Sequence, residues 1–188
     1  AAQSARLLTQ LDTPVRDALA TADSYPQWVL MGSLNGADVG ALPDILLGGD
    51  DVAIEKVVRE SSKPGREDGM LAVVHATAGW SRTRYNADRD EIAEELAREL
   101  SRTLDAIGIG AEFVADRAHR WGLARPGSLC PDQCARAGSL NLAACGDGFA
   151  AALGDDRSRI EDGVQNAFLS GVAAAGRVLA ARPRRTGV

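Results

Sequence analysis

The chain has 188 residues, of which 45% are hydrophobic and 25% are charged, and its formal net charge is −5. This composition excludes a largely disordered polypeptide and indicates a folded chain of one domain or two small ones. The acidic balance lacks the basic footprint that phosphate contacts need, and no apolar run approaches the roughly 20 residues of a membrane helix. We therefore expect neither a nucleic acid nor a membrane as a partner.

The first half of the chain is expected to contain a helical segment followed by three strands. Apolar residues recur at helical spacing over residues 4–22, and Pro14 predicts a break there. Residues 32–51 are rich in glycine and are interpreted as a loop or a lid. The Pro-Gly turn at residues 61–66 separates the last two strands, which indicates an antiparallel pair. Apolar and β-branched runs predict these strands at residues 27–31, 52–58 and 70–77.

The second half contains the clearest helical pattern. Apolar residues at a spacing of four, with charged residues on the other faces, predict a helix over residues 88–104. Its apolar positions are Ile92, Leu96, Leu100 and Leu104. The other predicted elements are a strand at 111–117, an irregular stretch at 126–138, a short strand at 140–145 and a helix at 160–181.

The cysteines and histidines limit the metal and redox chemistry. Cys130 and Cys134 are three residues apart, Cys145 stands alone, and His75 and His119 are distant in sequence. A disulfide scaffold or a zinc site needs more such residues at regular spacing, so we expect no metal, free thiols and a cytoplasmic protein. No basic segment followed by an apolar one begins the chain, so no signal peptide is expected. His75 lies in the middle of a predicted strand and is interpreted as structural.

The C-terminal third carries the pattern that best indicates a ligand. A short apolar strand ends at Gly146-Asp147-Gly148, where glycine lets a ligand approach the backbone and an aspartate can accept hydrogen bonds from sugar hydroxyls. The next helix begins with Glu161 and Asp162, which suit the positive end of its dipole and argue against a phosphate there. A neutral polar group or a delocalised anion is the better ligand. Small residues at a spacing of four lie on one face of this helix, at Gly163, Ala167, Gly171 and Ala175.

Two segments of this region resemble a known family. Residues 145–149 (Cys-Gly-Asp-Gly-Phe) and residues 160–171 resemble the C-terminal flavin motif of FAD-dependent amine oxidoreductases, and they are most similar to the renalase-like branch. That branch carries a His-(Lys/Arg)-Trp segment upstream, which is matched here by His119-Arg120-Trp121. The Lys-Pro-Gly-Arg turn at residues 63–66 also fits, and the similarity spans nearly the whole chain.

The chain departs from that family at one point. Family members begin with a Rossmann βαβ unit whose G-x-G-x-x-G turn holds the pyrophosphate of FAD, and this chain has no such turn. The resemblance therefore implies the second half of such an enzyme, either a natural subunit or a fragment. It also implies a partner chain that carries the Rossmann unit.

The fold class implied by the resemblance is α+β or α/β. It combines a substrate domain, with an antiparallel or mixed sheet and helices, and the C-terminal strand and helix of an FAD-binding Rossmann-type domain. Residues 1–125 form most of the substrate domain, and residues 126–138 form an irregular linker. Residues 139–182 form the strand, loop and helix of the FAD-binding domain, and residues 183–188 form a frayed basic tail.

The resemblance also implies a cofactor and a reaction. The cofactor is non-covalent FAD, and a hydride passes to flavin N5 from a small-molecule substrate, an amine or a reduced nicotinamide-type compound, with O2 as the reoxidant. Trp121, Trp80 and His119 are candidates for the substrate side, and each has a structural alternative as a core tryptophan or a hydrogen-bonded histidine. The alternative function is a non-catalytic interaction subunit that keeps the scaffold and binds no flavin. The implied cofactor-binding residues are Gly146, Asp147, Gly148, Asp162, Gly163, Val164 and Ala167.

Overall fold

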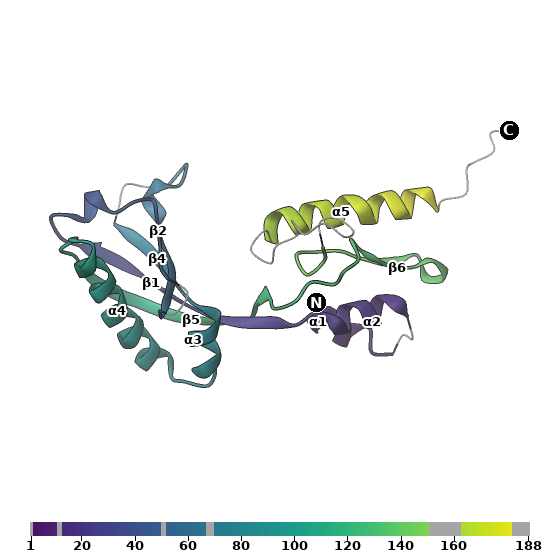
Figure 1. The fold of residues 1–188 in the computed structure, drawn as a ribbon, viewed down its shortest axis with the longest axis horizontal. Coiled ribbons are helices and arrows are strands. Elements are labelled where there is room, and N and C mark those ends of the chain that lie inside the picture. Colours follow the sequence, from purple (N-terminus) through teal and green to yellow (C-terminus); the bar gives the residue numbers. More distant parts are fainter. Residues whose placement is uncertain (1, 11–12, 50–51, 67–69, 151–162, 182–188) are drawn as a thin grey trace. The chain divides into compact units, whose positions relative to one another are not determined.

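The computed structural model describes residues 2–10, 13–49, 52–66, 70–150 and 163–181. They form a mixed α+β structure of two compact units (Figure 1). The sheet unit is Pro26–Ala124, and the helical unit combines Ala1–Tyr25 with Arg125–Val188. This division differs from the predicted one, which kept residues 1–125 together, because the first helices pack with the C-terminal part of the chain.

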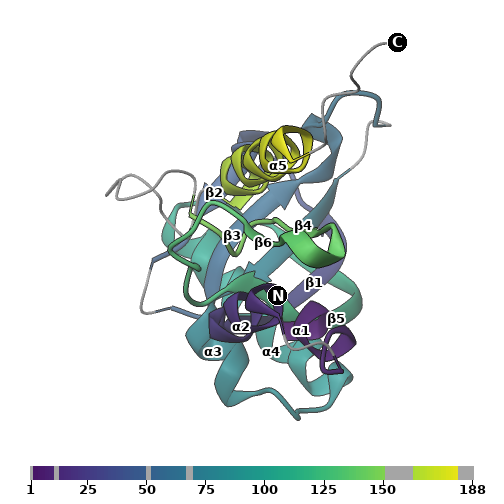
Figure 2. The ribbon, with the colours of Figure 1, turned by 90° about the vertical axis from the view of Figure 1, so that its right-hand side faces the viewer.

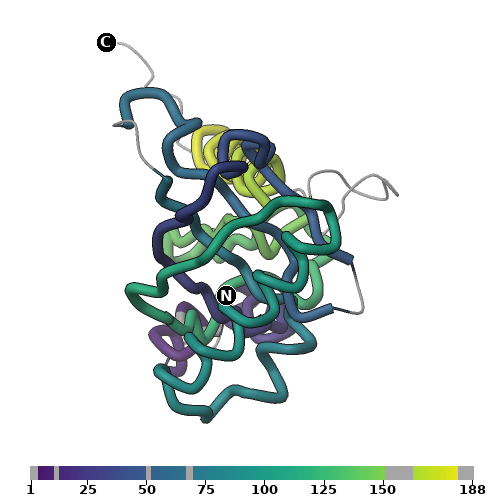
Figure 3. Tube along the Cα trace, turned by 90° about the vertical axis from the view of Figure 1, so that its left-hand side faces the viewer, coloured from purple at the N-terminus to yellow at the C-terminus, as the bar shows by residue number. Residues whose placement is uncertain are grey.

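The sheet unit is built on a five-stranded antiparallel sheet in the order β2-β3-β4-β1-β5. The pairing of β3 with β4 confirms the predicted antiparallel pair. The loop expected at residues 32–51 is wrong in part, because this stretch contains the end of β1 and all of β2, which is held by pairing with β3. The strands, which can be followed along the trace in Figure 3, are β1 (Ser24–Asn35), β2 (Ile45–Leu47), β3 (Ile54–Arg59), β4 (Leu71–Ala76) and β5 (Glu112–Pro126).

Two helices pack on one face of this sheet, α3 (Ala78–Thr83) and α4 (Arg89–Ala106). Asp88 caps the N-terminus of α4, and its carboxylate accepts a hydrogen bond from the backbone N–H of Asp90 at 2.8 Å. All four predicted apolar positions of α4 are buried, which confirms the amphipathic pattern. The core beneath them contains Trp28, Leu30, Leu34, Val57 and Val74.

The helical unit contains α1 and α2, a β-hairpin and α5 (Figure 2). The predicted break at Pro14 is confirmed, since α2 starts there and Thr13 caps it by accepting the backbone N–H of Arg16 at 3.2 Å. Val15 and Leu19 of α2 then pack into a second, smaller core. The helices of this unit are α1 (Ala2–Leu7), α2 (Pro14–Thr21) and α5 (Gly163–Ala180).

The hairpin consists of β6 (Ala135–Ala137) and β7 (Leu142–Ala144), which pair antiparallel. β7 confirms the short strand predicted at residues 140–145, whereas β6 lies in the stretch expected to be irregular. Asn141 precedes β7 with a φ of 50°, a conformation that asparagine tolerates better than most residues. No local sequence pattern indicated β6, which is a strand because it pairs with β7.

None of the described helices is both long and apolar enough to cross a membrane. Within the same ranges, no group of three or more His, Cys, Asp or Glu residues could hold a metal ion. Cys130 and Cys134 are buried free thiols, and Cys145 is an exposed one.

Candidate functional site

The candidate site is the loop that follows β7, together with the first turns of α5. Gly146 has a φ of 149°, a conformation that L side chains rarely adopt. Its backbone N–H donates to the Oγ of Ser170 at 3.1 Å, and Ser170 is fully buried. A Cβ added to Gly163 would lie 3.8 Å from the Cβ of Asp147, so Asp147 lies beside the first residue of α5. The loop is thus hydrogen-bonded to α5 at Ser170 and passes beside the first residue of that helix.

Backbone bonds hold the other end of the loop. The Cys130 N–H donates to the carbonyl oxygen of Gly148 at 2.7 Å, and the Ala150 N–H donates to the carbonyl oxygen of Cys130 at 3.0 Å. A guanidinium N–H of Arg177 on α5 donates to the carbonyl oxygen of Cys134 at 3.2 Å. The segment that contains Cys130 and Cys134 therefore holds the loop through backbone hydrogen bonds, and its two free thiols are buried.

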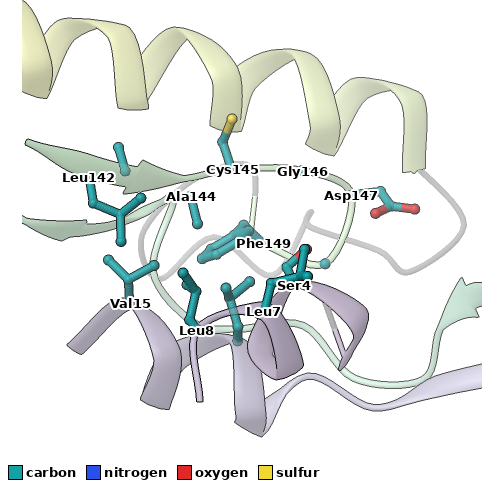
Figure 4. Close-up of a pocket in the computed structure, with 13 residues that line it drawn as sticks. Ser4, Leu7, Leu8, Val15, Leu142, Ala144, Cys145, Gly146, Asp147 and Phe149 are labelled. Atoms are coloured by element: carbon teal, nitrogen blue, oxygen red, sulfur yellow. The ribbon is translucent and has the colours of Figure 1, made fainter. Parts of the chain in front are cut away.

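A cavity of about 350 Å³ lies under this loop (Figure 4). Its wall is mainly apolar, and Ser4 and Asp147 are among its polar members. Figure 4 shows Phe149 between the loop and the N-terminal helices, and Asp147 next to the start of α5. The volume is at the lower end of the range of roughly 300–1,000 Å³ for ligand pockets. The lining residues are Ser4, Leu7, Leu8, Val15, Leu19 and residues 142–149.

α5 presents two different faces. Asn166, Ser170 and Ala174 are buried at a spacing of four and form the face that packs within the helical unit. Large apolar side chains line another face, where Val164 is 89% exposed and Phe168 is 68% exposed. We call this face the α5 apolar stripe, and its members are Val164, Phe168, Val172 and Leu179.

The structure brings some of the predicted cofactor residues together. Gly146, Asp147 and Gly148 meet the start of α5 at Gly163, as described above. Ala167 is partly buried one turn further along the helix, and the side chain of Val164 belongs to the α5 apolar stripe. Asp162 lies outside the described residues.

The sequence interpretation missed Ser170, which anchors the loop, and Arg177, which braces the cysteine segment. The spacing of four that joins Asn166, Ser170 and Ala174 was a signal that could have identified the packing face.

Two of the three substrate-side candidates lie together in the sheet unit. The rings of His119 and Trp121 on β5 form a T-shaped pair with centroids 4.8 Å apart, and Trp121 is 58% exposed. Trp80 is on α3, where it packs against the core, and the guanidinium of Arg84 lies 4.2 Å from its ring centroid. Arg120 lies between His119 and Trp121 in the sequence, and its guanidinium is 4.0 Å from the ring centroid of Tyr85.

The chain matches no protein-family model. The exposed carboxylate of Asp147 can accept hydrogen bonds from hydroxyl groups, and the glycines beside it leave the backbone accessible. The first turn of α5 favours negative charge. These features fit the ribityl chain and the pyrimidine edge of a flavin, whereas no G-x-G-x-x-G turn of the chain is available for its pyrophosphate.

Proposed function

We propose that this chain is the second half of an FAD-dependent oxidoreductase that removes a hydride from an amine or a reduced nicotinamide-type substrate. The observation that carries the proposal is the contact between the Gly146-Asp147-Gly148 loop and the first turns of α5. In this proposal β7 and α5 are the C-terminal strand and helix of the FAD-binding domain, and the sheet unit is most of the substrate domain. The free thiols favour a reducing compartment, the cytoplasm.

The chain's own residues would bind and orient the cofactor. Asp147 would accept hydrogen bonds from ribityl hydroxyls, and the backbone amides of Gly163 and Val164 would hold the pyrimidine edge. The positive end of α5 would favour negative charge at that edge. When bound, the flavin supplies the hydride-accepting N5, and O2 takes up the two electrons to give hydrogen peroxide. His119 and Trp121 are the candidates for contact with the substrate.

A partner chain with the Rossmann unit is the second part of the proposal. The α5 apolar stripe supports it, because an exposed row of large apolar side chains is typical of a surface that binds a partner. The same stripe favours the other candidate function, an interaction subunit that binds a partner but no flavin. The two functions differ in whether the assembled complex retains FAD.

Flavin retention by the full chain distinguishes these functions. The chain is coexpressed with a polypeptide that carries a G-x-G-x-x-G unit, such as the product of a neighbouring reading frame, and desalted after incubation with FAD. Visible flavin bands are expected to remain. Asp147→Ala is expected to weaken FAD binding at least about tenfold, because a charge-assisted hydrogen bond is lost.

Asp105→Ala is the matched control, since Asp105 is exposed on α4 in the sheet unit, and FAD retention should not change. A colourless complex with the partner bound would contradict the oxidoreductase and leave the interaction subunit. Equal retention by the two variants would contradict the role of Asp147.

A further inference from the structure

One of the four asparagines in the sequence, Asn35, is followed by glycine, and the two residues lie where a strand ends. Asn35 is the last residue of β1, and Gly36 begins the short connection to the buried Val39. Asparagine is a chemically labile residue, because the backbone nitrogen of the next residue can attack its side-chain amide. Glycine hinders this attack least, since it has no Cβ. The pair is therefore a candidate site of chemical modification.

Both groups that this attack requires are accessible. The side chain of Asn35 is exposed, and no hydrogen bond or ion pair of the described residues uses it. Gly36 is also exposed, and its N–H donates to no acceptor in the described part of the chain. Neither the amide nor the attacking nitrogen is therefore held by a competing bond.

The fold requires glycine at position 36. Gly36 has a φ of 152°, a conformation that L side chains rarely adopt. A Cβ built on it would lie 2.4 Å from the carbonyl oxygen of Gly110, just before β5. A larger residue, which would slow the attack, is thus excluded by the packing of the sheet unit.

Each of the other three asparagines lacks one of these features. Asn86 is exposed, but the N–H of Ala87 donates to the carbonyl oxygen of Arg84 at 3.1 Å. Asn141 is followed by a leucine that is paired in the β6–β7 hairpin. Asn166 is fully buried within α5. Asn35 alone combines exposure, a following glycine and an uncommitted backbone nitrogen.

We propose that Asn35 is a site of spontaneous deamidation. The backbone nitrogen of Gly36 forms a bond to the side-chain carbonyl carbon of Asn35, and the side-chain amide leaves as ammonia with the proton of that nitrogen. Water then opens the cyclic imide at either carbonyl, which gives aspartate or isoaspartate. Water is the only co-reactant, and either product adds one negative charge to a chain of formal net charge −5.

Isoaspartate is the product that should alter the fold. It places one additional methylene in the backbone between Leu34 and Val39, which are each 1% exposed and belong to the core of the sheet unit. Aspartate leaves the backbone length unchanged. We therefore expect only the isoaspartate form to disturb the packing of Gly36 against Gly110. These residues all belong to the sheet unit, so the inference does not depend on the flavin site in the helical unit.

Peptide mapping by mass spectrometry tests this proposal on the full chain, incubated at neutral pH and physiological temperature. We expect a mass gain of about 1 Da at Asn35 that accumulates at least about tenfold faster than at Asn86. A synthetic peptide of residues 30–40 gives the rate without the fold. Because the site is exposed and unbonded, the rate in the folded chain should stay within about tenfold of the peptide rate.

Matched variants complete the test. Asn35→Ser should abolish the mass gain in this peptide, whereas Asn86→Ser should leave it unchanged. Asn35→Asp carries the new charge without the additional methylene, so its urea midpoint should equal that of the fresh chain. The isoaspartate form, separated by anion exchange, should unfold at a lower urea concentration.

Three results would count against the proposal. Equal rates at Asn35 and Asn86, or a folded chain more than about tenfold slower than the peptide, would overturn the site itself. An isoaspartate form with an unchanged urea midpoint would overturn its effect on the sheet unit. None of these outcomes depends on FAD retention.

Discussion

Gly48→Ala is expected to lower the free energy of unfolding of the sheet unit by about 3 kcal/mol. Gly48 follows β2, and its N–H donates to the carbonyl oxygen of Glu55 at 2.7 Å. A Cβ at this position would lie 1.8 Å from the carbonyl oxygen of Ile54. Since the clashing atom belongs to the backbone of β3, the strand itself has to move, and so does the β-bulge at Glu55, where the register of β3 against β4 shifts.

Gly40→Ala is the matched control for this prediction. Nothing lies within 4 Å of a Cβ built on Gly40, so the change should stay within about 0.5 kcal/mol. All three tryptophans lie in the sheet unit, so tryptophan fluorescence during urea unfolding reports on that unit alone. Equal midpoints for the two variants would show that β2 and β3 can separate at little cost.

An element of the sheet unit could be predicted from the sequence where its local hydrophobic pattern matches the residues that are buried in the structure. The spacing of Ile92, Leu96, Leu100 and Leu104 in α4 is both a local signal and the actual buried stripe, and it identified the helix. β2 has only three residues between glycines and a proline, and its stability comes from pairing with β3. The bulge at Glu55 has no local signal, because it exists only in the register between β3 and β4.

The loop of the candidate site could be predicted from the sequence, but the residues that pack against it could not. Glycine and aspartate after a short strand indicated the loop, because these residue types have few other uses at such a position. The packing of Val15 and Leu19 with Phe149 joins the two ends of the chain, and no local pattern specifies it. For the same reason, the sequence indicated that His75 is a structural residue within a strand but not its contact with Gln27, which depends on the pairing of β1 with β4.

Phe149→Ala is expected to destabilise the helical unit by about 3–5 kcal/mol. Phe149 is 2% exposed and joins the candidate loop to the core that contains Val15, Leu19 and Cys130. Such a loss is a large part of the roughly 5–15 kcal/mol that stabilises a typical domain. Hydrogen exchange of α2 and α5 should therefore accelerate strongly, whereas tryptophan fluorescence of the sheet unit should show an unchanged unfolding midpoint.

Phe168→Ala makes the same chemical change on the α5 apolar stripe. Phe168 is 68% exposed, so the stability of the helical unit should change by no more than about 0.5 kcal/mol. The same variant should nevertheless weaken binding of the partner that carries the Rossmann unit, because a large exposed aromatic residue is a typical anchor of an interface. Phe149→Ala is thus expected to impair folding of the helical unit, and Phe168→Ala is expected to impair only binding of the partner. Strong destabilisation by Phe168→Ala would mean that the stripe is needed to fold the unit, and unchanged partner binding would exclude it from the interface.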